Sequence, residues 1–356
     1  MPIYPRPELE HVSQIPHGGY QKRFGEPELL DFSANVNPFG PTPRLWEALQ
    51  KVPLGQHPDP RATTLRHFLA NLLGLPAQQI LIGNGSIELI YQIAVAYLRP
   101  KDQVLIVEPT FGEYAAASMM MGAEIIRWQT KLENSFALKI EELGTFLRKN
   151  QPRLLFLCNP NNPTGLFRQC EEIEYILQQA PETLFILDEA FIRFVDHAWS
   201  ALPLLKYENL LILRSLTKDY ALTGLRVGYA VAAPTTIAAL AKVQPPWSVN
   251  ALAQTGALAA LCDEAHLQTS LAALAQAKKE FVNDLIALGQ KVLASEVNFF
   301  LLKVDSAREW AQKLREKGIL VRDTTSFGLP NTIRVATRQA AENKHFVETI
   351  KNILKG

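Results

Sequence analysis

The sequence is poor in cysteine and has no long apolar run. Its three cysteines, Cys158, Cys170 and Cys262, show neither the spacing of a metal site nor that of a disulfide framework. No apolar run approaches the roughly 20 residues of a membrane span, and the first ten residues lack the apolar segment of a secretion signal. We therefore expect a protein of the reducing cytoplasm with no metal centre and no membrane contact, whose cysteines are buried thiols.

An excess of charge of either sign is also lacking. The chain has 36 basic and 35 acidic residues, a formal net charge of +1, and no block of lysine and arginine. We therefore do not expect nucleic acid or an anionic membrane as a partner. Hydrophobic residues make up 47% and charged residues 20% of the 356 residues, which is typical of a soluble protein with a large core. This length predicts about two domains.

Short runs rich in leucine and β-branched residues alternate with longer helical patterns in the first two thirds of the chain. Most of these runs are apolar almost throughout, which predicts strands covered on both faces, as in a mainly parallel α/β sheet. The intervening patterns place apolar residues on one helical face, as between residues 87 and 98. The seven predicted strands are residues 79–82, 103–107, 124–128, 154–158, 184–188, 210–214 and 227–231.

The pattern changes after Pro246. An alanine-rich helical stretch runs from about Ala251 to about Ala294, and it is followed by short strands that alternate with helices. We expect strands at residues 298–304, 319–322 and 333–336. This indicates an α+β unit. We predict three parts: an N-terminal arm (residues 1–40) that packs on the small domain, a large domain (41–246) and a small domain (247–356).

One short stretch, S-L-T-K-D-Y-A-L-T-G-L-R, places Ser215 three residues before Lys218 and Arg226 eight residues after it. Ser-x-x-Lys also occurs in serine acyl-transfer enzymes of the β-lactamase kind. However, the chain contains no Lys-Thr-Gly or Lys-Ser-Gly, and Ser215 follows a predicted strand. The other interpretation is a desolvated lysine that forms a Schiff base with an aldehyde or ketone. Taken alone, Lys218 is more typical of a solvated loop.

Three further features follow predicted strands. The turn G-N-G-S (residues 83–86) precedes a predicted helix, and the N-terminus of a helix attracts phosphate. A turn that only connects the strand to the helix would have the same sequence pattern. Asp188 ends a buried strand, where a carboxylate either caps a helix or pairs with a protonated ring nitrogen. The turn N-P-N-N-P-T-G (residues 159–165) ends another strand and offers an amide to a ligand, or is only a turn.

Together these features carry a resemblance to a known family. The turn N-N-P-T-G, the Asp188 strand and S-x-T-K-x(7)-R have the order and spacing of fold-type I pyridoxal-phosphate enzymes, the aspartate aminotransferase superfamily. The chain resembles the histidinol-phosphate aminotransferase branch and, more closely, threonine-phosphate decarboxylases. The likeness to the second group rests on H-G-G (17–19), D-F-S-A-N-V-N-P-F-G (31–40), L-D-E-A-F-I (187–192), R-S-L-T-K (214–218) and P-W-S-V-N-A-L-A (246–253).

The resemblance implies pyridoxal 5′-phosphate as the cofactor, held covalently by Lys218, which would also move a proton at the substrate α-carbon. Asp188 would pair with the pyridinium nitrogen and make the ring an electron sink, and Asn162 would donate to the ring O3′. Tyr114 is the first choice for an aromatic side chain stacked on the ring, and Phe111 is the second. The residues expected to bind the cofactor phosphate are Gly85, Ser86, Ile87, Ser215 and Arg226.

For the substrate, the resemblance implies a small phosphorylated molecule that is like an amino acid. Arg334 would bind its carboxylate, for which a guanidinium fork is the natural partner. Arg322 is expected to reach a phosphate, and Asn35 to contact the substrate from the arm. A homodimer is implied by the family alone.

The sequence departs from the resemblance at two positions. Phe191 stands where most relatives on the histidinol-phosphate side have a tyrosine that donates to O3′, and a lost hydrogen bond to a charged group is worth roughly 1.5–3 kcal/mol. The decarboxylase-like enzymes also have phenylalanine there. His57 stands where both branches usually offer a tyrosine from the neighbouring subunit, and its charge depends on pH near neutrality.

The resemblance implies decarboxylation of L-threonine O-3-phosphate to aminopropanol phosphate, a step of cobalamin synthesis, and Phe191 and the two candidate anion sites Arg322 and Arg334 favour this reaction. The alternative is transamination of histidinol phosphate or an aromatic amino acid with 2-oxoglutarate. A third hypothesis is a non-enzymatic binding or regulatory module on the same fold. The intact set of Lys218, Asp188 and Asn162 argues against it, since such a module has no need of a Schiff-base lysine.

Overall fold

The computed structural model describes residues 3–19 and 28–355. Seven strands form one sheet in the order β2-β8-β7-β6-β5-β3-β4, and every strand is parallel to the others except β8, which is antiparallel to both of its neighbours. All seven strands begin and end within one residue of the sequence-based expectation, and β5 and β6 match it at both ends. The bounds are β2 (Ile80–Gly83), β3 (Gln103–Glu108), β4 (Glu124–Gln129), β5 (Leu154–Cys158), β6 (Leu184–Asp188), β7 (Leu210–Ser215) and β8 (Gly228–Ala232).

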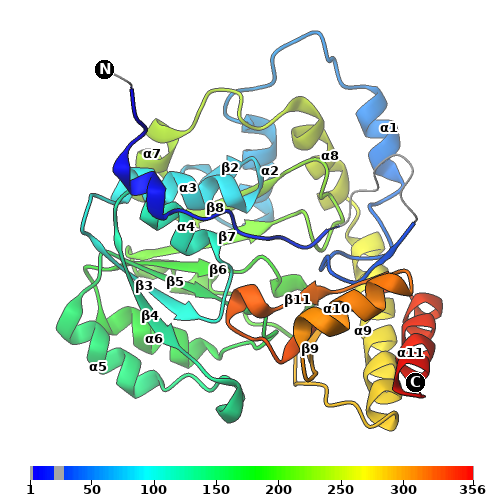
Figure 1. Cartoon of the computed structure of the whole chain (residues 1–356). Coiled ribbons are helices and arrows are strands. Elements are labelled where there is room, and N and C mark those ends of the chain that lie inside the picture. The colour runs from blue at the N-terminus through cyan, green and yellow to red at the C-terminus, as the bar shows by residue number, and fades with distance from the viewer. Residues whose placement is uncertain (1–2, 20–27, 356) are drawn as a thin grey trace.

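Helices cover both faces of this sheet (Figure 1). One face packs on α2 (Thr63–Leu73), α5 (Ile140–Asn150), α6 (Cys170–Gln179) and α8 (Ala251–Leu261), and α1 (Arg44–Gln50) lies against α8. The other face packs on α3 (Gly85–Tyr97), α4 (Glu113–Met120) and α7 (Pro234–Val243). Because apolar side chains point into both layers, all residues of the central strands β5 and β6 are buried. This confirms the expected mainly parallel α/β sheet.

A second unit follows in the chain. Its antiparallel sheet has the order β11-β12-β9, and the parallel pair β1-β10 lies beside it. The helices pack around Phe281, Phe300 and Phe346, which are buried together with Phe32 from the N-terminal part. The bounds are β1 (Leu30–Asp31), α9 (Glu264–Ala287), β9 (Phe299–Lys303), α10 (Ala307–Glu316), β10 (Ile319–Leu320), β11 (Arg322–Asp323), β12 (Thr332–Ala336) and α11 (Ala340–Lys355).

The alanine-rich helical stretch differs from its prediction. It is two helices, α8 and α9, and α9 ends at Ala287 rather than near Ala294. The backbone of Gly289 adopts φ +77°, a left-handed conformation that commonly terminates helices. The side chains of Ala253 and Ala257 in α8 belong to the core under the large sheet. A division of the chain by its cores would fall within α9, whose Leu267 belongs to the first core and whose Phe281 belongs to the second, and the boundary at residue 246 stays a prediction.

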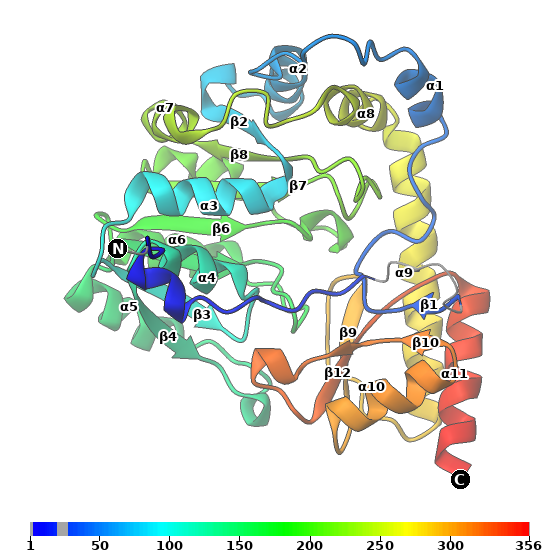
Figure 2. The same ribbon diagram turned by 45° about the horizontal axis from the view of Figure 1, so that its top comes forward.

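The described part of the N-terminal arm runs along both units (Figure 2). A short 3₁₀ helix, η1 (Pro7–His11), lies beside α4, where the Arg6 guanidinium donates to the Met120 carbonyl at 3.1 Å. Further on, the Phe32 amide donates to the Leu320 carbonyl at 2.8 Å, and the Phe32 carbonyl accepts from the Ala336 amide at 2.8 Å. The arm therefore crosses the place where the carboxyl ends of β5, β6 and β7 face the second unit. In the described ranges, no helix combines the length and apolarity needed to cross a membrane.

Phe281→Ala in α9 tests how strongly the second core supports the fold. The Phe281 ring is 1% exposed and packs edge-on against Phe300 and Phe346, with centroids 5.4 and 5.3 Å away. We expect the substitution to lower the free energy of unfolding by about 3–5 kcal/mol, measured by urea titration, because it leaves a cavity. The control is Ile286→Ala in the same helix, where the side chain is 54% exposed and a change within about 0.5 kcal/mol is expected.

Candidate active site

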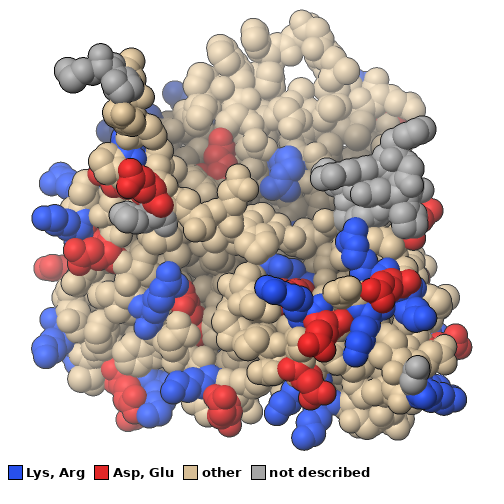
Figure 3. Space-filling view, viewed as in Figure 1, with Lys and Arg blue, Asp and Glu red and all other residues tan. Residues whose placement is uncertain are grey.

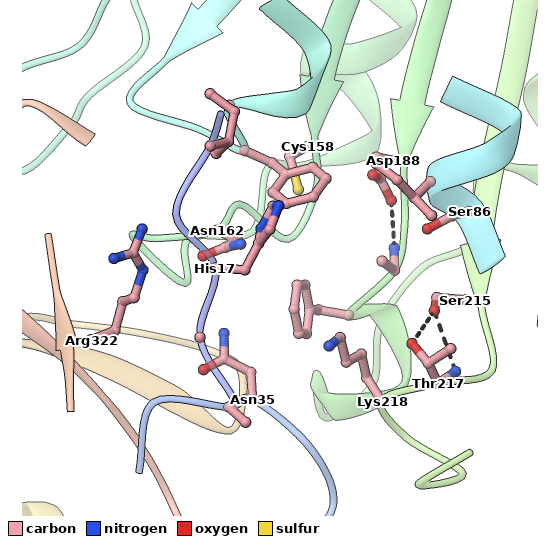
Figure 4. Close-up of a pocket in the computed structure, with 18 of the residues that line it drawn as sticks. His17, Asn35, Ser86, Cys158, Asn162, Asp188, Ser215, Thr217, Lys218 and Arg322 are labelled. Atoms are coloured by element: carbon pink, nitrogen blue, oxygen red, sulfur yellow. Dashed lines mark hydrogen bonds between the residues drawn. The ribbon is translucent and has the colours of Figure 1, made fainter. Parts of the chain in front are cut away.

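A cavity of about 390 Å³ lies at the carboxyl ends of β5, β6 and β7. Its walls come from the arm (residues 15–18), the segment 33–35, the N-terminus of α3, the loops after the three strands, and the second unit. Figure 4 shows Lys218 on one side of this space and Arg322 on the other, with Asn35 and Asn162 between them. Of the predicted site residues, all twelve line this cavity: Asn35, Gly85, Ser86, Ile87, Tyr114, Asn162, Asp188, Ser215, Lys218, Arg226, Arg322 and Arg334.

Lys218 lies on the loop after β7, and its amine faces the cavity (Figure 4). Burial, together with the positive charges of Arg334 and Arg226, lowers the pKa of the lysine to about 8. The backbone is held by the Asn37 amide, which donates to the Lys218 carbonyl at 2.9 Å. A lysine in this state is largely freed of its proton at mildly alkaline pH, as a Schiff-base nucleophile requires.

Asp188 is the last residue of β6 and is 4% exposed. Its Oδ1 accepts from the Ala190 amide at 3.0 Å, and its Oδ2 accepts from the Tyr114 hydroxyl at 2.7 Å. Burial raises the pKa of the carboxyl to about 6, against the opposing effect of these two hydrogen bonds. The group is thus mostly ionised at neutral pH and suits a protonated ring nitrogen.

Tyr114 does not have the geometry that its expected stacking role requires. Its ring is fully buried and stacks on Phe156, with centroids 4.8 Å apart, and its hydroxyl is used by Asp188. Phe111, the second choice, lies edge-on to Tyr114 at 5.6 Å and is only partly buried in the cavity wall. The geometry therefore favours Phe111 over Tyr114 as the ring that covers a cofactor.

The expected phosphate-binding site lies where the N-terminus of α3 packs closely against the ends of β7 and β8. The N-terminus of α3 receives no hydrogen bond from the Asn84 side chain, so the first amides of the helix remain available to an anion. Gly228 of β8 permits this approach, because a Cβ there would lie 2.6 Å from the Ser86 nitrogen and 2.8 Å from the Arg214 carbonyl oxygen. The hydroxyls of Ser215 and Thr217 lie 2.7 Å apart at the same place.

Arg226 lies beside this helix end and contributes positive charge to it. A Cβ on Gly85 would lie 3.0 Å from its guanidinium. The backbone of Gly85 has φ +75°, which favours glycine at the turn. The first amides of α3, the hydroxyls of Ser215 and Thr217 and the Arg226 guanidinium thus lie close together. This set of donors fits a phosphate group.

Two arginines of the second unit face the opposite side of the cavity. Arg334 donates to the side-chain oxygen of Asn162 and, at 2.7 Å, to the Ser33 carbonyl. The amide nitrogen of Asn162 is thereby left to donate into the cavity. Arg322 donates to the Pro16 carbonyl and the Ser326 hydroxyl, both at 2.7 Å. Burial and the neighbouring Arg322 charge lower the pKa of Arg334 to about 9, so an anion between the two guanidiniums would be well matched.

Some residues of the cavity wall were missed by the sequence analysis as site residues. His17 of the arm lies 2.8 Å from a carboxylate oxygen of Glu113, whose other oxygen accepts from the Tyr91 hydroxyl at 2.7 Å. H-G-G was noted only as part of a resemblance, and nothing in its spacing placed the histidine in the site. Cys158, Thr217 and Ser326 also line the wall, next to predicted residues.

The two departures from the family pattern have different positions. Phe191 lines the cavity and packs edge-on against Phe299 at 5.1 Å, so no hydroxyl is offered at this point. His57 is not part of the cavity wall of this chain, and it stacks on Trp247 with centroids 4.7 Å apart.

The molecular surface around the site carries charges of both signs. Figure 3 shows lysine and arginine interspersed with aspartate and glutamate on the face that contains the hollow. Among the described residues, no group of three or more histidine, cysteine, aspartate or glutamate side chains could hold a metal ion.

The fold and the cavity define the class of protein, a fold-type I pyridoxal-phosphate enzyme. The sequence model of the family "Aminotransferase class I and II" matches residues 27–350, and the chain belongs to this family. The expected fold class, enzymatic nature and cofactor, pyridoxal 5′-phosphate, are thereby confirmed.

Individual similar proteins include histidinol-phosphate aminotransferases and a threonine-phosphate decarboxylase. The chain is 34% identical to histidinol-phosphate aminotransferases of Moorella thermoacetica, over 94% of this chain and 88% of the relative, and of Symbiobacterium thermophilum, over 97% and 96%. It is similar to the crystal structure of L-threonine-O-3-phosphate decarboxylase from Porphyromonas gingivalis, with 30% identity, a TM-score of 0.81, and 92% and 100% of the two chains covered. The fold also matches histidinol-phosphate aminotransferase from Sinorhizobium meliloti in complex with pyridoxal 5′-phosphate, with a TM-score of 0.85 at 23% identity over 98% and 97%.

Covalent trapping tests the assignment of Lys218. The cofactor-loaded protein is reduced with borohydride, digested and mapped, and the label is expected on Lys218 alone. Lys278 is an internal control, because burial also lowers its pKa to about 8 but its amine donates to the Ser295 carbonyl outside the cavity. A label on Lys278 or any other lysine would overturn the assignment. Lys218→Ala should abolish turnover and the near-visible absorption of the bound cofactor without unfolding the protein.

The pH dependence of cofactor capture tests the environment of Lys218. Only the unprotonated amine attacks an aldehyde, so the rate at which cofactor-free protein captures pyridoxal phosphate should rise with pH around a midpoint near 8. Arg334→Gln removes a positive charge that lowers this pKa and should move the midpoint to higher pH. Arg334→Lys keeps the charge and is the matched control. An identical midpoint in wild type and Arg334→Gln would contradict the electrostatic explanation.

Proposed function

We propose that the chain acts at the amine-bearing carbon of a small phosphorylated amine. The observation that carries this proposal is the arrangement of Lys218 opposite the guanidiniums of Arg322 and Arg334 in one cavity. These two arginines are close enough for the charge of one to lower the pKa of the other. A phosphate dianion between them would relieve this repulsion and accept from both guanidiniums.

Each guanidinium also has uncharged partners, namely the Pro16 and Ser33 carbonyls, the Ser326 hydroxyl and the Asn162 amide oxygen. Neither arginine therefore depends on a second anion of the substrate. This weakens the sequence-based preference for a substrate with both phosphate and carboxylate. A substrate that carries a phosphate alone fits the same pair of arginines.

Different residues of the chain have different roles at the reacting carbon. The bound cofactor supplies an electron sink for the bond that breaks at this carbon. Lys218 would move the proton that leaves or enters at this carbon, since its side chain carries the only lysine amine in the cavity among the described residues. With the cofactor bound, Asp188 would keep the ring nitrogen charged, the Asn162 amide nitrogen would donate to the ring oxygen, and Phe111 would cover one face of the ring.

The first candidate reaction is transamination of histidinol phosphate. It is supported by the curated relatives, two of which are 34% identical over 94% and 97% of this chain and carry that name. The relatives thus favour the alternative over the decarboxylase that the residues alone favoured. In this reaction Lys218 would move the proton from the amine-bearing carbon to the cofactor side, and the two arginines would hold the phosphate.

The second candidate is decarboxylation of O-phospho-threonine. A specific observation favours it: Phe191 is 5% exposed in the cavity wall and offers no hydroxyl to the ring oxygen, which fits the resemblance to threonine-phosphate decarboxylases. The 30% identity to the Porphyromonas gingivalis decarboxylase is a second one. Arg334 would then hold the carboxylate and Arg322 the phosphate.

We further propose that two copies of the chain form a homodimer. Trp46, Leu54 and Trp247 are 64%, 74% and 47% exposed, which is unusual for such large apolar side chains. The surface over α1 and α8 in Figure 3 is also largely free of charge. His57 stacks on Trp247, so it would lie at this interface.

Product analysis distinguishes the two reactions. The loaded enzyme is incubated with histidinol phosphate and 2-oxoglutarate, and separately with O-phospho-threonine. We expect glutamate in the first mixture, and no product in either from Lys218→Ala. Carbon dioxide and aminopropanol phosphate in the second mixture, without glutamate in the first, would replace transamination by decarboxylation. Absence of product in both would reject the proposal of a phosphorylated amine as substrate.

A further inference from the structure

We propose that Tyr114 is a positioning residue that holds the Asp188 carboxylate ionised and fixed toward the cofactor ring through the hydrogen bond from its hydroxyl. This inference rests on the proposed cofactor site at Asp188 and Lys218, and it does not depend on which substrate is used. It assigns to Tyr114 a task different from stacking on the ring.

The first support is the rigidity with which the hydroxyl is held. Tyr114 lies in the first turn of α4 and is 0% exposed. Phe156 of β5 stacks on one face of its ring at an interplanar angle of 10°, and Phe111 lies edge-on at 81°. The Ser118 hydroxyl donates to the Tyr114 carbonyl at 2.7 Å and ties down the backbone. A phenol packed in this way keeps its hydroxyl at one point in space.

The second support is the shortage of other donors around Asp188. In the described parts of the chain, its carboxylate accepts from one side chain, Tyr114, and from one backbone amide, that of Ala190. The Cys158 thiol, which lies beside both residues, donates to the Pro160 carbonyl at 3.2 Å. A carboxylate has about four acceptor positions, so a ring N–H can still be received after these two bonds.

The third support is the charge balance around Asp188. Its ionisable neighbours are Tyr114, Cys158 and Glu189. None of them is a cation, and the negative charge of Glu189 raises the pKa of Asp188 further. Glu189 itself is paired with Arg214 at 2.6 Å, so that guanidinium is engaged elsewhere. No ion pair of Asp188 with lysine or arginine occurs in the described ranges.

The charge of Asp188 thus depends on hydrogen bonds. Burial, together with the charge of Glu189, raises the pKa of this carboxyl to about 6 even with the hydrogen bonds from Tyr114 and Ala190 in place. Without the hydroxyl the pKa would rise further, and more of the carboxyl would carry a proton at pH 7. A neutral acid cannot hold a ring nitrogen in its protonated form. Tyr114 therefore acts on the cofactor through Asp188.

Tyr114→Phe tests this role, because it removes the hydroxyl and keeps the ring between Phe156 and Phe111. The measured quantity is the dissociation constant of pyridoxal phosphate from pH 5 to 9, by titration of cofactor-free protein. We expect binding about tenfold weaker near neutral pH, the order of effect for a lost hydrogen bond to a charged group. Affinity is lost as pH falls through the Asp188 pKa, so this acid limb should move to higher pH by about one unit.

A double-mutant cycle separates this role from simple packing. Asp188→Asn removes the charge on which Tyr114 acts, so adding Tyr114→Phe to it should change cofactor affinity little further. The matched control is Tyr207→Phe, in which a hydroxyl that donates to Glu174 at 2.8 Å, remote from the cavity, is lost. We expect wild-type affinity and an unchanged acid limb for this control.

Two outcomes would overturn the proposal. Tyr114→Phe with an unshifted acid limb, or an equal loss of affinity in the wild-type and Asp188→Asn backgrounds, would leave Tyr114 a packing residue only. If Asp188→Asn itself binds the cofactor like the wild type, the cofactor site at Asp188 is wrong, and the fault lies there rather than with Tyr114. Urea unfolding of each variant shows whether a loss reflects the site or the fold.

Discussion

The cavity brings several buried positive charges close together, and the surrounding structure stabilises them. Lys218, Arg226, Arg322 and Arg334 all face one space that contains a single acidic side chain in its described wall, Asp188. A buried charge without compensation is costly, so each group is either neutralised or given partners. The pKa values of Lys218 and Arg334 are lowered, and the guanidiniums of Arg322 and Arg334 donate to backbone carbonyls of the arm, those of Pro16 and Ser33. The excess of positive charge is what makes the cavity a site for doubly anionic ligands.

Much of the fold could be predicted from the sequence, since the strands of the large sheet are buried on both faces and read as continuous apolar runs. β5 and β6 match the prediction to the residue. The strands of the second unit were harder to predict from the sequence. A single run at residues 319–322 became two short strands, β10 and β11, that pair with different partners. Such a division depends on tertiary contacts and leaves no mark on hydrophobic periodicity.

In the site, too, the residues of sequence motifs could be predicted, whereas contacts between residues far apart in the chain could not. The residues of the large-sheet motifs reach one cavity because the carboxyl ends of neighbouring parallel strands meet there. The stacking role of Tyr114 was expected from the family resemblance, and the sequence could not show that its hydroxyl meets Asp188, 74 positions away. His17 was missed for a related reason: its place in the wall depends on the path of the arm. The reaction type depends on how two arginines hold one substrate, and it is the relatives that shift the balance toward transamination.

The path of the arm also constrains the order in which the parts of the chain can fold. Phe32 is part of the same core as Phe281 and Phe346, and its backbone bonds to Leu320 and Ala336. A ribosome delivers these segments far apart in time, because roughly 300 residues separate them. Domains usually fold as units while synthesis continues. The core of the large sheet takes its last side chains, Leu267 and Leu271, from the first half of α9, whereas the second unit needs α11 before Phe32 can be enclosed. The catalytic cavity, whose wall includes Arg322 and Arg334 of the second unit, is therefore completed only after α11 has been synthesised.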